Sequence, residues 1–134
     1  CIRDSYVPYV KSNKLIFVSG QIPMLNGELV TGKIGKNIEI EDAKTAARLC
    51  GLAIVSQLNE ATDLDLDKIK RIVKLGGFVN CVDEFTQQPE IINGASDLMV
   101  EVFGDKGKHS RFAVGTNSLP RNVVVEIEAV AEIH

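Results

Sequence analysis

HSRFAVGTNSLPRNVVVEIE, residues 109–128, contains the alternating pattern from which we infer the fold of this chain. Its apolar alternation predicts two strands, Ser110–Thr116 and Val123–Ile133, joined by a turn rich in Asn, Ser and Pro. We expect these strands to form an antiparallel hairpin centred between Ser118 and Leu119. A slip of one residue would move every side chain to the opposite face, so burial should enforce the register.

This register gives the hairpin one polar and one apolar face. On the polar face Arg111 lies opposite Glu126, and His109 lies opposite Glu128, beside Ala113 and Val124. The apolar face carries Phe112 and Val114 opposite Val125 and Val123. A shift of two residues keeps both faces but pairs the charges differently, and the sequence leaves that alternative open.

The pairing of Arg111 with Glu126 has two interpretations. A guanidinium presents a planar fork of donors that matches a carboxylate, so Arg111 could bind a small anion. Glu126 could then orient the arginine or act as a base on a bound water. The alternative is a cross-strand ion pair on a solvated sheet face, which stabilises by about 0.2–1 kcal/mol.

The rest of the chain predicts a two-layer α+β domain. Two helices with apolar stripes would cover one face of a mixed β-sheet, in the order β-β-α-β-α-β-β. The expected elements before the hairpin are strands at Tyr6–Val10 and Lys14–Ser19, a helix at Glu41–Leu58, a strand at Asp67–Val82, and a helix from Gln88 that stops at Gly104.

Four positions have an ordinary explanation as well as a functional one. Gly20 is typical of a plain turn, although it would also let a ligand approach the backbone. Gly76-Gly77 indicates a bulge or a close contact with another element. Cys50 belongs to a helical apolar stripe, which favours a packed core thiol. Asn93, from its helical spacing alone, is solvated.

Composition restricts the class of protein. A chain of 134 residues is long enough for a buried core, so we expect one domain over residues 1–134. The net charge of −3, without a basic run that interleaves with aromatics, speaks against nucleic-acid binding. Three cysteines without metal-ligand or CxxC spacing favour a reducing compartment.

The expected location is the cytoplasm. No apolar run approaches the ~18 residues of a membrane span, and no signal peptide is recognisable. Cys1 is not an initiator residue, so we expect the natural start to lie upstream of it.

The chain also resembles the Rid family, known as YjgF-like or endoribonuclease L-PSP proteins. The resemblance covers essentially the whole chain and is specific in its combination of motifs. These are Ser19-Gly20-Gln21-Ile22-Pro23, Phe78-Val79, Asn93, Arg111-Phe-Ala-Val-Gly115, Leu119-Pro120 and Val125-Glu-Ile-Glu-Ala-Val130. It implies a chorismate-mutase-like fold and a homotrimer with three sites at subunit interfaces.

The resemblance also implies an activity. Better-known members of the family hydrolyse reactive 2-imino acids, or their enamine tautomers, to 2-oxo acids and ammonia without a metal or cofactor. By resemblance Arg111 clamps the substrate carboxylate and Glu126 lies near the attacking water. The implied substrate-binding residues are Tyr9, Gly20, Asn93, Ala113 and His109.

This chain departs from the better-known members at two places. Many members carry Cys where this chain has Ala113, so a thiol role is lost while the backbone contact remains possible. His109, two residues before Arg111, resembles a less-studied branch, so substrate scope does not transfer. We therefore expect a deaminase, a hydrolase of C=N bonds; the alternative is a non-catalytic trimeric protein that binds small carboxylates or regulates. Endoribonuclease or translation-inhibitor activity ranks third, because an acidic surface fits RNA poorly.

Overall fold

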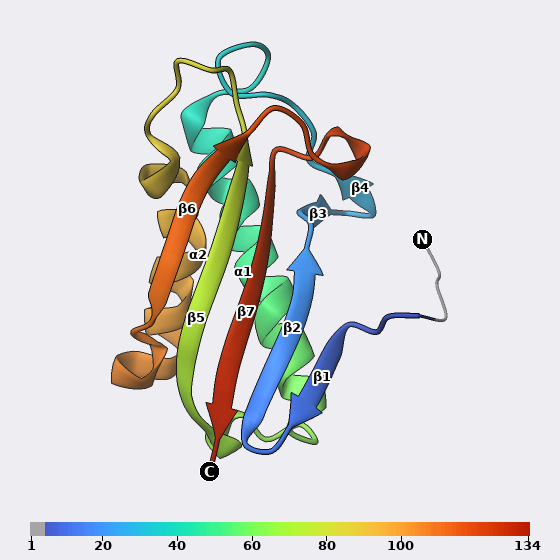
Figure 1. The fold of residues 1–134 in the computed structure, drawn as a ribbon, viewed down its shortest axis with the longest axis vertical. Helices are drawn as coiled ribbons and strands as arrows, with labels where there is room; N and C mark the ends of the chain where they lie inside the picture. Colours follow the sequence, from blue (N-terminus) through green and yellow to red (C-terminus); the bar gives the residue numbers. More distant parts are fainter. Residues whose placement is uncertain (1–4) are drawn as a thin grey trace.

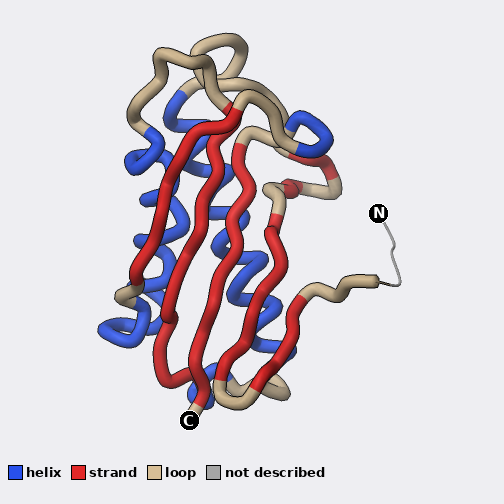
Figure 2. Tube along the Cα trace, in the orientation of Figure 1, coloured by secondary structure: helices blue, strands red, loops and turns tan. Residues whose placement is uncertain are grey.

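A computed structural model describes residues 5–134, so the expectations that concern Cys1 lie outside the described residues (Figures 1 and 2). The regular elements follow one another in the predicted order. They are β1 (Tyr9–Ser12), β2 (Leu15–Gln21), β3 (Met24–Leu25), β4 (Glu28–Leu29), α1 (Ile40–Ala61), η1 (Leu66–Lys68), β5 (Ile69–Asn80), α2 (Gln88–Phe103), η2 (Gly104–Gly107), β6 (Ser110–Thr116), η3 (Pro120–Asn122) and β7 (Val125–Ile133).

Five strands form one mixed sheet in the order β1-β2-β7-β5-β6. The pairs β1–β2, β2–β7 and β7–β5 are antiparallel, whereas β5–β6 is parallel. Both helices lie on one side of this sheet, as Figure 1 shows. The predicted α+β two-layer architecture with two helices on one face is therefore confirmed. We call the side of the sheet away from the helices the open face.

The helices form where the apolar spacing predicts them. Cys50 lies in the buried stripe of α1 and is fully buried, as its helical position indicates. α2 begins with Pro89 in its first turn, where a proline costs no hydrogen bond. It ends at Gly104, whose φ of 65° is accessible to glycine without a Cβ penalty.

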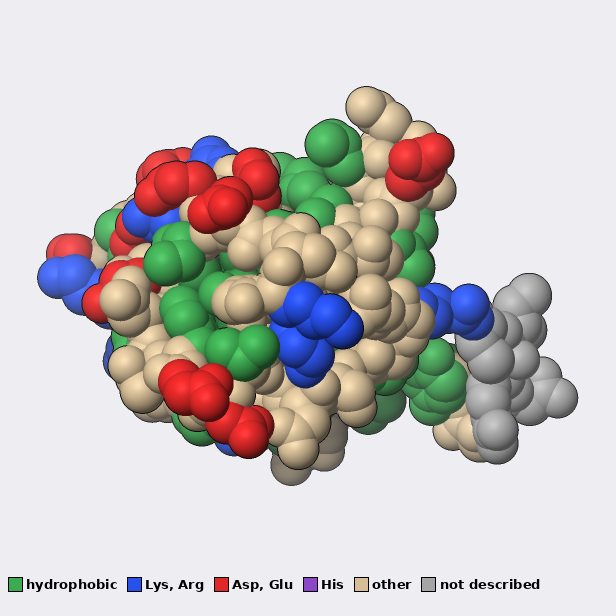
Figure 3. All heavy atoms as spheres, turned by 90° about the horizontal axis from the view of Figure 1, so that it is seen from above, with side chains coloured by type: hydrophobic (Ala, Val, Ile, Leu, Met, Phe, Trp, Pro, Cys, Tyr) green, Lys and Arg blue, Asp and Glu red, His purple; other side chains and the backbone are tan. Residues whose placement is uncertain are grey.

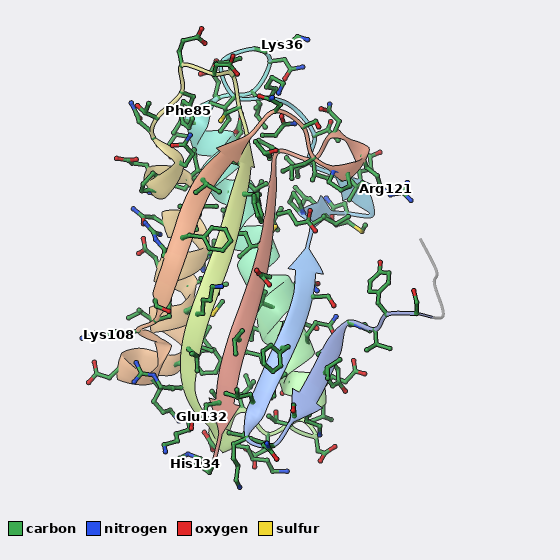
Figure 4. The ribbon with its side chains drawn as sticks, viewed as in Figure 1. Lys36, Phe85, Lys108, Arg121, Glu132 and His134 are labelled. Atoms are coloured by element: carbon green, nitrogen blue, oxygen red, sulfur yellow. The ribbon has the colours of Figure 1, made fainter. Side chains whose placement is uncertain are left out.

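The predicted hairpin between the last two strands is wrong. β5 lies between β6 and β7 and pairs with both of them, so β6 and β7 have no register with one another. The physical reason is the crossover: a parallel neighbour needs a long connection, and α2 supplies it between β5 and β6. The connection that contains η3 then passes over the end of β5, with Arg121 pointing outward (Figure 4).

The predicted faces of β6 are also wrong. Arg111 pairs with Leu75 and Ala113 with Gly77, on the side of the sheet that α2 covers. Phe112 and its neighbour Val114 lie on the open face. Along β7 the prediction holds, because its apolar set is buried under the helices: Val125, Ile127, Ala129 and Ala131. Just before this strand Val123 and Val124 are both fully buried, so the expectation of Val124 on the exposed polar face is wrong.

Gly76 and Gly77 both allow a close contact with a neighbouring element. A close contact was one of the two predicted explanations, and a bulge was the other. A Cβ on Gly77 would lie 2.6 Å from Ile92 of α2, so this glycine lets the helix approach the sheet. A Cβ on Gly76 would lie 2.7 Å from the Phe112 ring on the open face. The irregular register of β5 falls earlier in the strand, between Ile69 and Lys74.

The open face carries large apolar side chains that α1 and α2 do not cover. Phe17, Phe78 and Val114 are 44%, 38% and 42% exposed. Phe78 and Phe112 make an edge-to-face pair with ring centroids 5.3 Å apart.

None of the helices within residues 5–134 combines the length and the apolar character that a membrane span requires.

Candidate functional site

Arg111 is held against α2 by three hydrogen bonds. Its Nη1 donates to Asn93 Oδ1 at 2.8 Å and to Ser96 Oγ at 3.0 Å, while Nη2 donates to the Pro89 carbonyl at 3.4 Å. The side chain is half-buried at the edge of the sheet. Among residues 5–134 it belongs to no ion pair, so its charge is not neutralised by a carboxylate there.

The three partners of Arg111 come from one face of α2. Pro89, Asn93 and Ser96 are spaced by four and then three residues, which places their side chains in one row along a helix. The interpretation of Asn93 as a merely solvated residue is therefore wrong. Sequence reasoning missed Ser96, although its helical spacing from Asn93 is a signal that could have found it.

Both ring nitrogens of His109 are engaged by the protein. Nδ1 lies 2.6 Å from the Gly107 carbonyl oxygen, and Nε2 lies 2.9 Å from Ser96 Oγ. A carbonyl oxygen can only accept, so Nδ1 carries the hydrogen of that bond. His109 therefore connects to Arg111 through the Ser96 hydroxyl, and the expected opposition of His109 to Glu128 is wrong.

Ala113 lies on the same side of β6 as Arg111, two residues further along the strand. It is partly buried and packs against the core. The structure therefore brings together Arg111, Asn93, His109 and Ala113 on the side of the sheet that α2 covers, where the parallel β6 strand forms the edge.

Glu126 lies on the open face, next to Gly20. A Cβ on Gly20 would lie 2.4 Å from Glu126 Oε2, so this position needs a glycine for the carboxylate to keep its place. The register of β2 against β7 shifts between Val18 and Gln21, which places Gly20 at a bulge inside a strand rather than in the plain turn. Together with Phe78 and Glu128 these residues line a shallow hollow of about 220 Å³.

The Glu126 carboxyl has a raised pKa. Burial raises its pKa above the ordinary value of 4.5, and the negative charge of Glu128 raises the pKa further. Each cause disfavours the ionised form. A carboxyl of this kind exchanges a proton closer to neutral pH than a solvated one, which suits a general base or acid.

Tyr9 is separate from both groups. It lies on β1 at the opposite edge of the sheet from β6, where it is partly buried against the core. Its pairing with Val18 places it on the side of the sheet that faces the helices.

Within one copy of the chain, the candidate residues therefore form two groups on opposite faces. Arg111 and Glu126 lie two strand spacings apart across β5, and their partners Leu75 and Phe78 are three residues apart along it, so their Cα atoms are roughly 14 Å apart. The first group can bind an anion through the guanidinium. The second can accept or donate a proton. A single copy does not direct both toward one small molecule.

The comparisons with known proteins agree with this fold. Residues 2–133 match the family model described as "YjgF/chorismate mutase-like, putative endoribonuclease". The protein TCP17 of Trypanosoma cruzi is 44% identical over 132 residues, which cover 97% of this chain and 82% of that protein. A protein of Lactococcus lactis described as "Putative regulator AldR" is 33% identical, with 94% of this chain and 87% of that protein covered.

Solved structures of similar proteins have the same fold. A protein of Agrobacterium tumefaciens, described as having unknown function, superposes with a TM-score of 0.95 at 47% identity, covering 98% of this chain and 83% of that one. The E. coli protein TdcF, solved with bound serine, superposes with a TM-score of 0.66 at 25% identity, covering 99% of this chain and 91% of that one.

Proposed function

Because the chain belongs to the YjgF/chorismate mutase-like family, also called the Rid family, we propose that it is a cofactor-independent deaminase of small 2-imino acids. The reaction consumes one water and converts the C=N bond to C=O, releasing ammonia and leaving a 2-oxo acid. The observation that carries this proposal is Arg111, which is oriented by α2 yet has no carboxylate partner among residues 5–134.

Arg111 binds the substrate carboxylate in this proposal. A guanidinium and a carboxylate make paired charge-assisted hydrogen bonds, which fix orientation as well as supplying affinity. The bound serine in E. coli TdcF supports the substrate class, since serine is a small molecule with a carboxylate.

Glu126 acts on the water. Its carboxylate accepts a proton as the water oxygen attacks the carbon of the protonated imine, forming a tetrahedral carbinolamine. The protonated carboxyl then gives this proton to the nitrogen, and the regenerated carboxylate takes the hydroxyl proton as the C–N bond breaks, so that ammonia leaves as the carbonyl forms. The raised pKa of Glu126 supports this double role, because an acid with a pKa closer to neutrality serves both directions.

The site requires more than one copy of the chain. Because Arg111 and Glu126 occupy opposite faces in one copy, a shared site needs the Arg111 face of one copy to approach the open face of another. Exposed Phe17, Phe78 and Val114 on the open face support such an association, since a large apolar area is rarely left uncovered. The proposed assembly is a homotrimer with three equivalent sites.

The proposal is tested with 2-iminopropanoate generated in situ. Its rate of conversion to pyruvate and ammonia is measured with and without protein, and the mass of the assembly is measured by light scattering. We expect a clear acceleration by a trimer. A monomeric mass at micromolar concentration would contradict the shared site, and an unchanged rate would contradict the enzyme.

A non-catalytic carboxylate-binding protein is the second candidate. The relative described as a regulator in Lactococcus lactis favours it. Both candidates need Arg111, so the discriminating result is pyruvate binding without acceleration of imine hydrolysis.

Ribonuclease activity receives less support from this chain. The family description includes it, but the net charge is −3, and acidic and basic side chains are interspersed on the face shown in Figure 3. Contacts with phosphates are salt-dependent, so RNA affinity that falls steeply with salt would favour this third candidate.

A further inference from the structure

We propose that Ser96 and His109 are positioning residues for Arg111, and that they fix which edge of its guanidinium meets the substrate carboxylate. This inference rests on the proposed function, because it assigns how the same anion-binding group is aimed. It concerns two residues that contact Arg111 directly or through one hydroxyl.

A count of the guanidinium hydrogens carries the first step. Nη1 has two hydrogens, and two acceptors lie within reach of it: Asn93 Oδ1 at 2.8 Å and Ser96 Oγ at 3.0 Å. Both Nη1 hydrogens are therefore used by α2. Among residues 5–134, Nη2 makes only the long 3.4 Å bond to the Pro89 carbonyl, and Nε makes none. We assign the free Nη2–H to the Nε side of the guanidinium, where it and the Nε–H form an edge with two donors, so the proposed carboxylate binds side-on to Arg111.

The second step depends on which atom donates each hydrogen bond between His109, Ser96 and Arg111. His109 Nδ1 donates to the Gly107 carbonyl. We assign a neutral imidazole, in which Nε2 then has no hydrogen and accepts one from Ser96. The Ser96 hydroxyl hydrogen is thereby directed toward His109, and an oxygen lone pair faces Arg111 Nη1. Without His109 that hydroxyl could rotate its hydrogen toward the cation, which would weaken the contact. His109 thus acts on Arg111 through Ser96.

A purely structural role makes a different prediction. His109 also joins η2 to α2, through the Gly107 carbonyl and the Ser96 hydroxyl. If this is all that it does, its loss would lower stability and leave ligand affinity unchanged. The decisive readouts are therefore the affinity for pyruvate and the separate effects on KM and kcat, together with the melting temperature.

The experiment compares six variants of the full chain with the wild type: Ser96→Ala, His109→Phe, His109→Gln, Ser110→Ala, the double variant Ser96→Ala/His109→Phe, and Arg111→Lys. Ser96→Ala should weaken pyruvate binding about tenfold, because a hydrogen bond to a charged group is lost, and should raise KM similarly while kcat stays within about twofold. His109→Phe should weaken binding about threefold, since the Ser96 hydroxyl remains but is no longer directed. His109→Gln should retain near-wild-type affinity, because its amide oxygen can accept from Ser96.

Ser110→Ala is the matched control. It removes a hydroxyl that donates to the Val73 carbonyl on the neighbouring strand and does not contact Arg111. Its affinity for pyruvate should equal that of the wild type. In the Ser96→Ala background, His109→Phe should cause no further loss, because its effect passes through the missing hydroxyl.

The outcomes separate this inference from the proposed function. If Arg111→Lys loses pyruvate binding while Ser96→Ala and His109→Phe bind as the wild type does, the positioning role is overturned and the proposed function stands. If Arg111→Lys itself binds normally, the proposed function fails. Additive losses in the double variant would overturn the route from His109 through Ser96. If His109→Phe does not fold, Ser96→Ala decides the positioning of Arg111, and wild-type affinity in that variant overturns it.

Discussion

Arg111 and Glu126 lie on opposite faces of one sheet, on strands that flank the same central strand β5. Arg111 is directed at α2 by Asn93 and Ser96, whereas Glu126 lies beside Gly20 on the open face. Each residue is fixed by its own surroundings, and the two are roughly 14 Å apart, because they are offset by two strand spacings across the sheet and by three residues along it. If they serve one reaction, the reaction takes place between copies of the chain.

Replacing Arg111 with lysine tests whether carboxylate binding needs the two parallel donors of the guanidinium. Arg111→Lys keeps the charge but cannot reproduce two parallel donors, so pyruvate binding should weaken by about 2 kcal/mol or more. Isothermal calorimetry measures the affinity, and the mass of the assembly is checked in parallel. Arg48→Lys, on the exposed side of α1 in an ion pair with Glu101, is the control and should bind normally. Equal affinity of wild type and Arg111→Lys would identify Arg111 as scaffold.

Gly20→Ala should displace the Glu126 carboxylate without unfolding the chain. The new Cβ would lie 2.4 Å from Oε2, and the carboxylate, at the end of a flexible side chain, can move away. We expect imine hydrolysis to fall by about tenfold or more, since small displacements of a reacting group are costly. The melting temperature should change by only a few degrees.

A double variant controls for indirect effects at this position. In the Glu126→Gln background, Gly20→Ala should lower activity no further, because the group that it displaces is already inactive. Wild-type activity in Gly20→Ala alone would show that the position of the carboxylate does not matter.

The raised pKa of Glu126 predicts a pH-dependent stability. The folded state binds this proton at a higher pH than the unfolded chain, so stability falls as pH rises from the unfolded pKa, near 4.5, through the folded pKa. Glu126→Gln removes this penalty. It should therefore be more stable than the wild type at neutral pH, with the difference vanishing below about pH 4.5.

Denaturant midpoints measured at a series of pH values check this prediction. Glu60→Gln, which removes a carboxylate on the exposed side of α1, serves as the matched control and should keep the wild-type pH profile. A Glu126→Gln profile parallel to that of the wild type would mean that Glu126 titrates alike in both states.

Asn80 is predicted to be a stability determinant at the end of β5. It is fully buried, and its Nδ2 lies within hydrogen-bond distance of the Gly32 and Val123 carbonyls and of Asn122 Oδ1. Asn80→Asp replaces this donor with an acceptor that faces other acceptors. Lys33 Nζ, which donates to Asn80 Oδ1 at 2.8 Å, would pair with the new carboxylate and offset only part of that loss. The free energy of unfolding should fall by about 2–4 kcal/mol.

Chemical denaturation measures that loss. The same replacement at the exposed Asn26, Asn26→Asp, should change the free energy of unfolding by no more than about 0.5 kcal/mol. A loss at Asn80 as small as that at Asn26 would show that the connection over the end of β5 does not depend on the buried amide.

The sequence predicts the layers of this fold better than the partners of its strands. Apolar stripes locate α1 and α2, and the alternation from Val123 to Ala131 identifies the buried side of β7. These are local properties of a helix or strand. The choice of β5 as the neighbour of β6 is not local, because it depends on the packing of α2 across the sheet.

The same limit applies to the site. The RFAVG and VEIEA motifs identify Arg111 and Glu126, but only the folded chain reveals that the two lie on opposite faces. Ser96 acquires its contact with Arg111 from a row of side chains on α2 and a neighbouring strand that meet only after folding. His109 stands two residues before Arg111 in the sequence, yet its connection through Ser96 could not be inferred from spacing.

Mixed assemblies of two inactive variants show whether Arg111 of one copy and Glu126 of another share a site. Arg111→Ala and Glu126→Gln are prepared separately, each with little imine hydrolysis, then unfolded together and refolded as a one-to-one mixture. If each site takes Arg111 from one copy and Glu126 from another, about one quarter of the sites in random trimers contain both wild-type residues. Activity should therefore recover to about one quarter of the wild-type rate. No recovery in mixed trimers of correct mass would contradict it, because Arg111 and Glu126 would then not meet in a shared site.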